Sequence, residues 1–189
     1  MINIVNFNII VYNGYNKKDV LANCIQTVKN FFNIDNWNFS QPINLSQLQL
    51  EIAKVDGVQS VANLEIVNLH EEFAVIAVQG PRSKELLESL GLDLNMDYMA
   101  FSHGQISGNE VIVCRTGYSG EHGYELLPKW SSSEPLWNAL VAAVGKLDGA
   151  VCGLGARDTL RTEMGYPLHG HELSLEITPI QASASWAVV

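Results

Sequence analysis

The start of the chain shows first a strand-like and then a helix-like pattern of apolar residues. Residues 4–12 are rich in Ile, Val and Phe and predict a strand that ends at the turn Asn13-Gly14. In residues 17–32, apolar residues recur at helical spacing, which predicts an amphipathic helix. The apolar stripe of that helix consists of Val20, Leu21, Cys24, Ile25, Val28 and Phe31.

A polar stretch follows at residues 33–63. Asn, Gln and Ser dominate it, and Pro42 interrupts the pattern. Within this stretch we expect a short helix at residues 45–55. Ser46 is its predicted N-cap, because a serine hydroxyl can accept a hydrogen bond from a free N–H group of the first turn.

Regular patterns return in the second half of the chain. Two strands are predicted, at residues 64–68 and 73–79. The second contains the uninterrupted run Phe-Ala-Val-Ile-Ala-Val, which predicts burial on both faces. Gly80 and Pro81 end this strand, and Pro81 is placed to occupy the first turn of a helix at residues 83–90.

The remaining elements decide the fold class. Further strands are predicted at residues 101–106, 110–116 and 124–128, and further helices at residues 134–147 and 156–164. Strands follow one another in runs and do not alternate strictly with helices. The sequence therefore predicts an α+β fold, a mainly antiparallel sheet covered by helices, which we treat as one domain over residues 1–189.

Composition narrows the classes of function. A chain of 189 residues that is 47% apolar can bury a core without a metal or a disulfide. The net charge of -9 argues against nucleic acid or an anionic membrane as partner. Three scattered cysteines without a CxxC motif indicate a reducing compartment, the cytoplasm or, in a eukaryote, the mitochondrial matrix. No apolar run reaches the roughly 18 residues of a membrane span, and Met1 to Ile10 do not form a secretory signal.

The glycine-rich segment at residues 115–125, RTGYSGEHGYE, contains the first candidate site. Its plain interpretation is a tight hairpin in which glycines adopt positive φ and Tyr118 covers a sheet edge. Glu125 favours a binding role, because a carboxylate at the start of a buried strand needs a partner. Its two oxygens match a planar N–H/NH₂ edge, as found on arginine, guanine or a pterin.

A second glycine-containing segment, GLGARDTLRTE, occupies residues 153–163. We reject a dinucleotide-binding fingerprint there, because Asp158 stands at the third glycine position and no strand-helix unit surrounds the segment. The plain interpretation is that Arg157, Asp158 and Arg161 form surface ion pairs. The alternative is that Arg157 faces a pocket while its helix packs on the sheet.

The third segment contains His169, His171 and Glu172, which are residue types that bind zinc. The spacing lacks a third convergent ligand, so we predict a solvent-facing loop that binds no metal. No GxSxG motif or Walker loop occurs, and we assign no catalytic residue.

Taken together, these segments resemble the aminomethyltransferase family, the T protein of the glycine cleavage system. The likeness covers residues 73–189 and continues more weakly at residues 8–22. The segments that carry it, in the order that the family has, are Ala77 to Pro81, Arg115 to Glu125, Gly153 to Glu172, and Thr178-Pro179 through Trp186-Ala187-Val188.

The resemblance implies a tetrahydrofolate-dependent transferase of glycine catabolism and one-carbon metabolism. The family passes a methylene group from the aminomethylated lipoyl arm of the H protein to tetrahydrofolate and releases ammonia. Tetrahydrofolate would be the co-substrate and the lipoylated H protein the partner. Glu125 would hold the pterin edge with help from Arg157, and Tyr118, Tyr166 and Asn13 would line the folate pocket.

The sequence also departs from the family pattern. The family's acidic residue that steers the reaction lies on a strand ahead of the segment that matches residues 4–13, and it has no counterpart here. The family's C-terminal barrel has no counterpart either. Residues 33–63 are longer than the family's usual connection, and Gln181 stands where an acid is common. We therefore expect an incomplete folate-binding domain with a polar insertion at residues 33–63, inactive on its own.

Two other functions stay open at this point. The first keeps the fold and changes the reaction, as in relatives that oxidise sarcosine or dimethylglycine, demethylate a sulfonium compound, or act in tRNA or iron–sulfur pathways. The second is a non-catalytic folate-binding or interaction module. Retention of Glu125 and Arg157 without an acid elsewhere would favour this second function.

Overall fold

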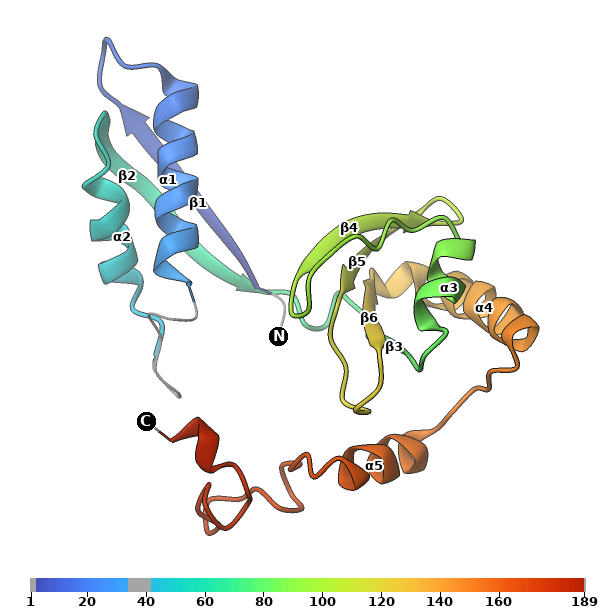
Figure 1. Cartoon of the computed structure of the whole chain (residues 1–189). Coiled ribbons are helices and arrows are strands. Elements are labelled where there is room, and N and C mark those ends of the chain that lie inside the picture. Colours follow the sequence, from blue (N-terminus) through green and yellow to red (C-terminus); the bar gives the residue numbers. More distant parts are fainter. Residues whose placement is uncertain (1–2, 34–41, 189) are drawn as a thin grey trace. The chain divides into compact units, whose positions relative to one another are not determined.

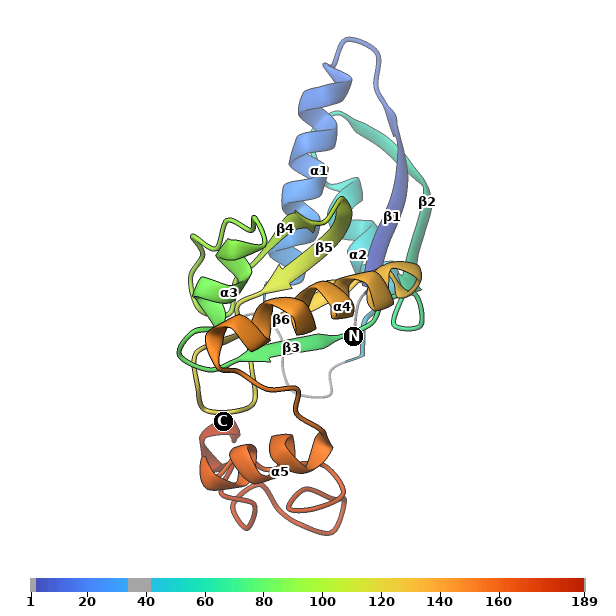
Figure 2. The same ribbon diagram turned by 90° about the vertical axis from the view of Figure 1, so that its right-hand side faces the viewer.

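The computed structural model describes residues 3–33 and 42–188, and its contacts divide the chain into two compact units (Figures 1 and 2). Unit 1 is Met1–His70 and unit 2 is Glu71–Val189. Each unit is an antiparallel sheet packed against helices, which confirms the predicted α+β class. Residues 34–41 of the expected insertion, and Met1, lie outside the described residues.

The order of the elements follows the predicted order closely. In the chain they are β1 (Asn3–Val11), α1 (Lys17–Phe31), α2 (Leu45–Ala53), β2 (Val58–Asn68), β3 (Ile76–Gln79), α3 (Ser83–Ser89), β4 (Phe101–Ile106), β5 (Asn109–Cys114), β6 (Gly123–Pro128), α4 (Ser133–Val144) and α5 (Leu154–Glu163), with short 3₁₀ turns at Trp130–Ser132, Gly145–Leu147 and Ser185–Ala187. None of the described helices combines the length and the apolar character that crossing a membrane would require.

Unit 1 is a two-stranded sheet whose one face is covered by α1 and α2 (Figure 1). The strands β1 and β2 run antiparallel, with Phe7 opposite Leu64. The core between sheet and helices is built on Val20, Cys24, Leu48, Ile52 and Val58, with Val5, Phe7, Ile9 and Val11 of β1 packed against it. The side chains of β1 therefore alternate between the core and the opposite face, as expected for a strand.

The N-cap of α2 differs from the prediction. The side chain of Asn44 accepts a hydrogen bond from the Gln47 N–H at 3.1 Å, so Asn44 caps the helix and Ser46 lies inside its first turn. Asparagine caps as well as serine does, and this start brings Leu48 and Ile52, four residues apart on one face, into full burial.

Unit 2 contains a four-stranded antiparallel sheet in the order β3-β6-β5-β4. Helices α3 and α4 lie on the same face of this sheet (Figure 1). The core between them includes Leu87, Val113, Leu126 and Leu136, all at most 1% exposed. One face of the sheet is therefore closed by helices from the same unit.

The strand predicted at residues 73–79 was expected to be buried on both faces. In the structure it is β3, which lies at the edge of the sheet. This strand is shorter than predicted and begins at Ile76. Among the described strands it pairs only with β6. Ile76 and Val78 pack on the core, whereas Val75 is 63% exposed. The prediction was wrong because an apolar run does not distinguish a central strand from an edge strand.

The turn after this strand also differs in detail. Gly80 connects β3 to α3 with φ at +118°, a conformation that glycine adopts without strain. Pro81 does not occupy the first turn of α3, because the helix begins at Ser83 and Arg82 is its N-cap residue. Pro81 belongs to the turn that precedes the helix.

Candidate functional site

Strand β6 places Glu125 on the sheet face opposite the helices. Its neighbours Tyr124 and Leu126 belong to the core with α3 and α4, and side chains alternate along a strand. The half-buried carboxylate of Glu125 accepts a hydrogen bond from the Thr116 hydroxyl at 2.5 Å. Glu125 thus has a fixed register and a polar neighbour that holds one of its two oxygens.

The glycine-rich segment forms an open loop and not the expected tight hairpin. β5 ends at Cys114, so residues 115–122 connect it to β6. Gln79 of the neighbouring strand holds this loop: its amide donates to the Thr116 carbonyl oxygen at 3.3 Å and accepts from the Ser119 hydroxyl at 2.8 Å. A Cβ added at Gly117 would lie 2.1 Å from Oε1 of Gln79, so glycine makes this close packing of the amide against the loop possible.

Tyr118 brings the glycine-rich loop together with the α5 segment. The guanidinium carbon of Arg157 lies 5.1 Å from the centroid of the Tyr118 ring, a cation–π arrangement. The rings of Tyr118 and Tyr166 are 5.3 Å apart between centroids, and the Tyr118 hydroxyl donates to the Pro167 carbonyl oxygen. Two segments about forty residues apart in sequence therefore meet at the Tyr118 ring.

A cavity of about 360 Å³ lies beside these groups, within the roughly 300–1,000 Å³ of small-molecule sites. Its lining consists of Tyr118, Leu154, Gly155, Arg157, Asp158, Arg161, Leu168 and His171. No carboxylate pairs with Arg157 in residues 3–33 or 42–188, so its charge is available to a ligand. An aromatic ring beside a free cation suits a flat, anionic molecule.

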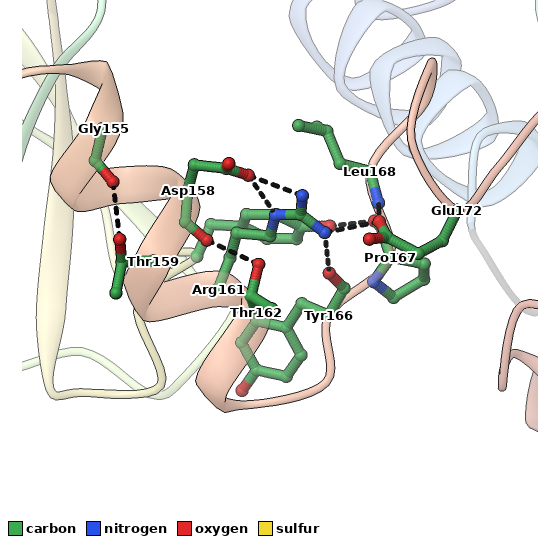
Figure 3. A network of polar contacts seen from close by, with 10 residues as sticks. Gly155, Asp158, Thr159, Arg161, Thr162, Tyr166, Pro167, Leu168 and Glu172 are labelled. Carbon is green, nitrogen blue, oxygen red and sulfur yellow. Dashed lines mark hydrogen bonds and ion pairs between the residues drawn. The ribbon is translucent and has the colours of Figure 1, made fainter.

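Arg161 is the buried centre of a polar network at α5 (Figure 3). Its side chain is 3% exposed and donates to Asp158, Glu172 and the Tyr166 carbonyl oxygen, the last at 3.1 Å. The sequence predicted ion pairs for Arg161 but placed them on the surface. The buried guanidinium bonds Asp158 of α5 as well as Tyr166 and Glu172 of the following loop, so it holds this loop against the helix.

Glu172 belongs to the same network. Its carboxylate accepts from the Leu168 N–H at 3.1 Å as well as from Arg161. The Leu168 N–H and then the Arg161 guanidinium lower the pKa of Glu172 below its usual value. His169 and His171 are exposed, and no group of three metal-binding side chains occurs in the described part of the chain. Glu172 therefore has a structural partner that the zinc hypothesis did not consider.

The five predicted folate-binding residues are distributed over both units. Tyr118, Tyr166 and Arg157 lie together, as described above. Glu125 and Tyr166 are not among the residues that line the cavity, and the residues described show no bond between Glu125 and Arg157. Asn13 is exposed in the turn after β1 and belongs to unit 1. That all five form one folate site stays a prediction.

Of the cavity lining, the predicted site residues include only Tyr118 and Arg157, and the polar residues that sequence reasoning missed are Asp158, Arg161 and His171. A signal for two of them was present, because residues three apart on a helix are neighbours and an aspartate can therefore hold an arginine across one turn. Nothing in the sequence around His171 indicated that it would line a cavity.

Comparisons with known proteins bear on the family and the fold of this chain. The family model of the GCVT N-terminal domain matches residues 12–189. An aminomethyltransferase of Mycobacterium bovis is 59% identical over 138 residues, which are 72% of this chain and 38% of that protein. An aminomethyltransferase of Parafrankia sp. is 54% identical over 138 residues, 73% of this chain and 38% of that protein. The chain thus spans 38% of the length of these curated relatives.

A solved structure supports the fold. The crystal structure of glycine cleavage system aminomethyltransferase T from Bartonella henselae is similar to this chain with a TM-score of 0.56 and 28% sequence identity. The match covers 77% of this chain and 36% of that one.

Proposed function

Because the chain belongs to the GCVT N-terminal domain family, we propose that it is the folate-binding portion of an aminomethyltransferase of the glycine cleavage system. In this reaction the methylene of an aminomethyl group on the lipoyl arm of H protein passes to tetrahydrofolate. The carbon–sulfur bond to the arm breaks, ammonia leaves, and the arm remains as the dithiol. The proposed setting is cytoplasmic one-carbon metabolism, with tetrahydrofolate as co-substrate and H protein as partner.

The meeting of Tyr118, Tyr166 and Arg157 beside the cavity is the observation that carries this proposal. Two of the four segments that resemble the family supply these residues, and their side chains contact one another. A tetrahydrofolate molecule combines a flat ring system with carboxylates. A tyrosine ring offers a stacking surface and a guanidinium pairs with carboxylate, so the residues present fit the co-substrate.

Glu125 has a separate proposed role, which is to accept two hydrogen bonds from the N–H/NH₂ edge of the pterin. Each charge-assisted bond would contribute on the order of 1.5–3 kcal/mol. The bond from Thr116 supports this role, because it fixes the carboxylate before a ligand arrives. Asn13 keeps its proposed role as a residue that lines a folate pocket, and the family match, residues 12–189, includes it.

The test is titration of this chain with tetrahydrofolate, followed by the fluorescence of its four tryptophans. We expect Glu125→Ala to weaken binding by about a hundredfold or more, because both bonds are lost and about 1.4 kcal/mol corresponds to a factor of ten. Glu121→Ala is the matched control, because Glu121 is exposed in the same loop and has no proposed contact with folate. Equal affinity of the wild type and Glu125→Ala would refute the role of Glu125.

Binding and not turnover is the appropriate first measurement, because the chain spans 38% of the length of its relatives. We propose that the chain alone binds folate without transferring the methylene group. Incubation with aminomethylated H protein and tetrahydrofolate should release no ammonia above the rate without protein. Ammonia release that depends on this chain would contradict this part of the proposal.

A further inference from the structure

Strand β1 of unit 1 has one edge on which its backbone pairs with no other described strand. One side of β1 pairs with β2, and no other strand within residues 3–33 and 42–188 pairs with its second side. The backbone N–H and C=O groups along a free edge can pair with another strand, and proteins usually guard such edges with charges, proline or bulges. The nine residues of β1, NIVNFNIIV, contain no charged residue, no proline and no glycine.

The partner strand β2, in contrast, has features that disfavour pairing with a further strand. β2 carries the charged residue Glu65. The pairing shifts register twice, and at each shift one residue of β2, Ala62 or Gln59, is left without a partner on β1. Both irregularities thus place the extra residue in β2, and bulges of this kind twist an edge away from further pairing. β1 is the regular edge, and a further strand would add there.

The sequence of β1 is close to a palindrome centred on Phe7. In an antiparallel pair of two β1 strands centred on this residue, Ile4 lies opposite Ile10 of the second copy, Val5 opposite Ile9, Asn6 opposite Asn8, and Phe7 opposite Phe7. From Ile4 to Ile10 each residue meets one of the same kind, and the correspondence ends at Asn3 and Val11. Pairs of apolar or amide side chains directly across two strands stabilise a sheet.

The same register also agrees with the two faces of the sheet. Val5, Phe7 and Ile9 pack against the helices, whereas Ile4 and Ile10 lie on the opposite face and are 45% and 50% exposed. Centring on Phe7 keeps the core residues of both copies on one face and covers Ile4 of one copy with Ile10 of the other. A slip by one residue would place core residues opposite exposed ones.

We propose that β1 is the interface between two copies of this chain, joined antiparallel about Phe7 into one four-stranded sheet. The pairing is isologous, because each β1 gives and receives the same contacts, so it closes as a dimer. The dimer would extend each two-stranded sheet to four strands with helices on one face. The uncharged strand adds no repulsion along the seam, although each copy carries a net charge of -9. This inference is independent of folate binding.

Sedimentation equilibrium over a range of protein concentrations tests the dimer. The variant Asn6→Lys/Asn8→Lys puts lysines opposite each other twice in the proposed register, and we expect its self-association to weaken by more than tenfold. The variant Asn6→Lys/Asn8→Glu puts lysine opposite glutamate in the same places, and we expect it to dimerise like the wild type. Position 6 tolerates lysine in the monomer, because Asn6 lies beside Glu65, whose carboxylate accepts its side-chain N–H at 3.1 Å.

The control Asn138→Lys/Ala142→Lys adds the same charge on exposed positions of α4 and should leave the wild-type dimer unchanged. The two strand variants also decide the register. In a parallel pair aligned on the same residues, the lysine–glutamate variant would oppose like charges and would dissociate. A monomeric wild type, a dimeric lysine–lysine variant, a monomeric lysine–glutamate variant or open-ended association into larger species would each overturn the proposal.

Discussion

Helices α4 and α5 follow one another in unit 2 but are held in opposite ways. α4 buries the apolar residues Leu136, Leu140 and Ala143 against the sheet. The buried residue of α5 is Arg161, while Leu154 of that helix is 83% exposed. Apolar burial makes α4 part of the cooperative core, whereas α5 depends on a few directional polar contacts. Regions held by few apolar contacts open at lower free energy, and the candidate cavity lies beside such a helix.

The largest test of this difference removes one leucine from each helix. Leu140 is 6% exposed, so we expect Leu140→Ala to lower the free energy of unfolding by about 2–5 kcal/mol through lost burial and a cavity. Leu154→Ala should change it by less than about 0.5 kcal/mol, because the side chain already lies in water. Denaturation in urea measures both. Equal losses at the two positions would show that α5 is packed as α4 is.

The second test compares a buried arginine with an exposed one. Arg161→Ala leaves Asp158 and Glu172 without their shared cation, and we expect a local loss of about 1–3 kcal/mol. Arg82→Ala removes an exposed pair with Glu85, for which about 0–1 kcal/mol is expected. Exchange of the Tyr166 amide hydrogen, which is bonded to the Arg161 carbonyl oxygen at 2.8 Å, reports the local loss. Unchanged protection of this amide in Arg161→Ala would mean that α5 does not depend on the network.

The same contrast explains which parts of the fold could be predicted from the sequence. α1 and α4 were placed within a few residues, because a repeated apolar stripe encodes a helix that packs on a core. The lateral order of the strands had no such local signal. The apolar run that became β3 was therefore predicted to be buried on both faces, although among the described strands it pairs on one side only.

For the candidate site, the sequence identified residue types better than their partners. Arg157 and Tyr118 were both predicted and do meet, but the contact itself could not be derived, because loop paths decide it. The burial of Arg161 was missed because its partner Glu172 is eleven residues away, beyond the reach of helical spacing. Contacts within one element could be predicted, and contacts across loops could not.

A third test concerns the glycine-rich loop, where it touches the end of α5. Gly120 has φ at +77°, and a Cβ there would lie 2.1 Å from Cγ of Met164. Gly108 has φ at +79° with open space around it. Both Gly→Ala variants carry the cost of a left-handed alanine, about 1–2 kcal/mol. Gly120→Ala should cost about 1 kcal/mol more, at the low end for overpacking because methionine adapts its shape. Thermal unfolding compares the two variants, and equal losses would show that the loop and α5 are not in contact.

The smallest expected effect is a dependence of the α5 region on pH. The Leu168 N–H and the Arg161 guanidinium lower the pKa of Glu172 in the folded protein. A lowered folded pKa means that the ionised carboxylate stabilises the fold above the unfolded value of about 4.3, and that this contribution is lost as pH falls through the lower folded value. Between these values the folded region still holds its charge, whereas the unfolded chain has taken up a proton. The side chain is 45% exposed, so the effect should be modest.

The Leu168 amide proton is the local probe of this titration, since its hydrogen bond ends on the Glu172 carboxylate. Its chemical shift, followed by NMR from pH 7 downwards, should change with a midpoint below about 4.3. Glu172→Gln keeps an oxygen acceptor for the Leu168 N–H but does not titrate, so its shift should stay constant over the same range. The core provides the internal reference: the Leu126 amide, within the sheet on which α4 packs, should not follow this titration. A midpoint of the Leu168 amide shift at or above about 4.3 would contradict this prediction. It would show that the ion pair with Arg161 does not stabilise the ionised carboxylate of Glu172 in solution.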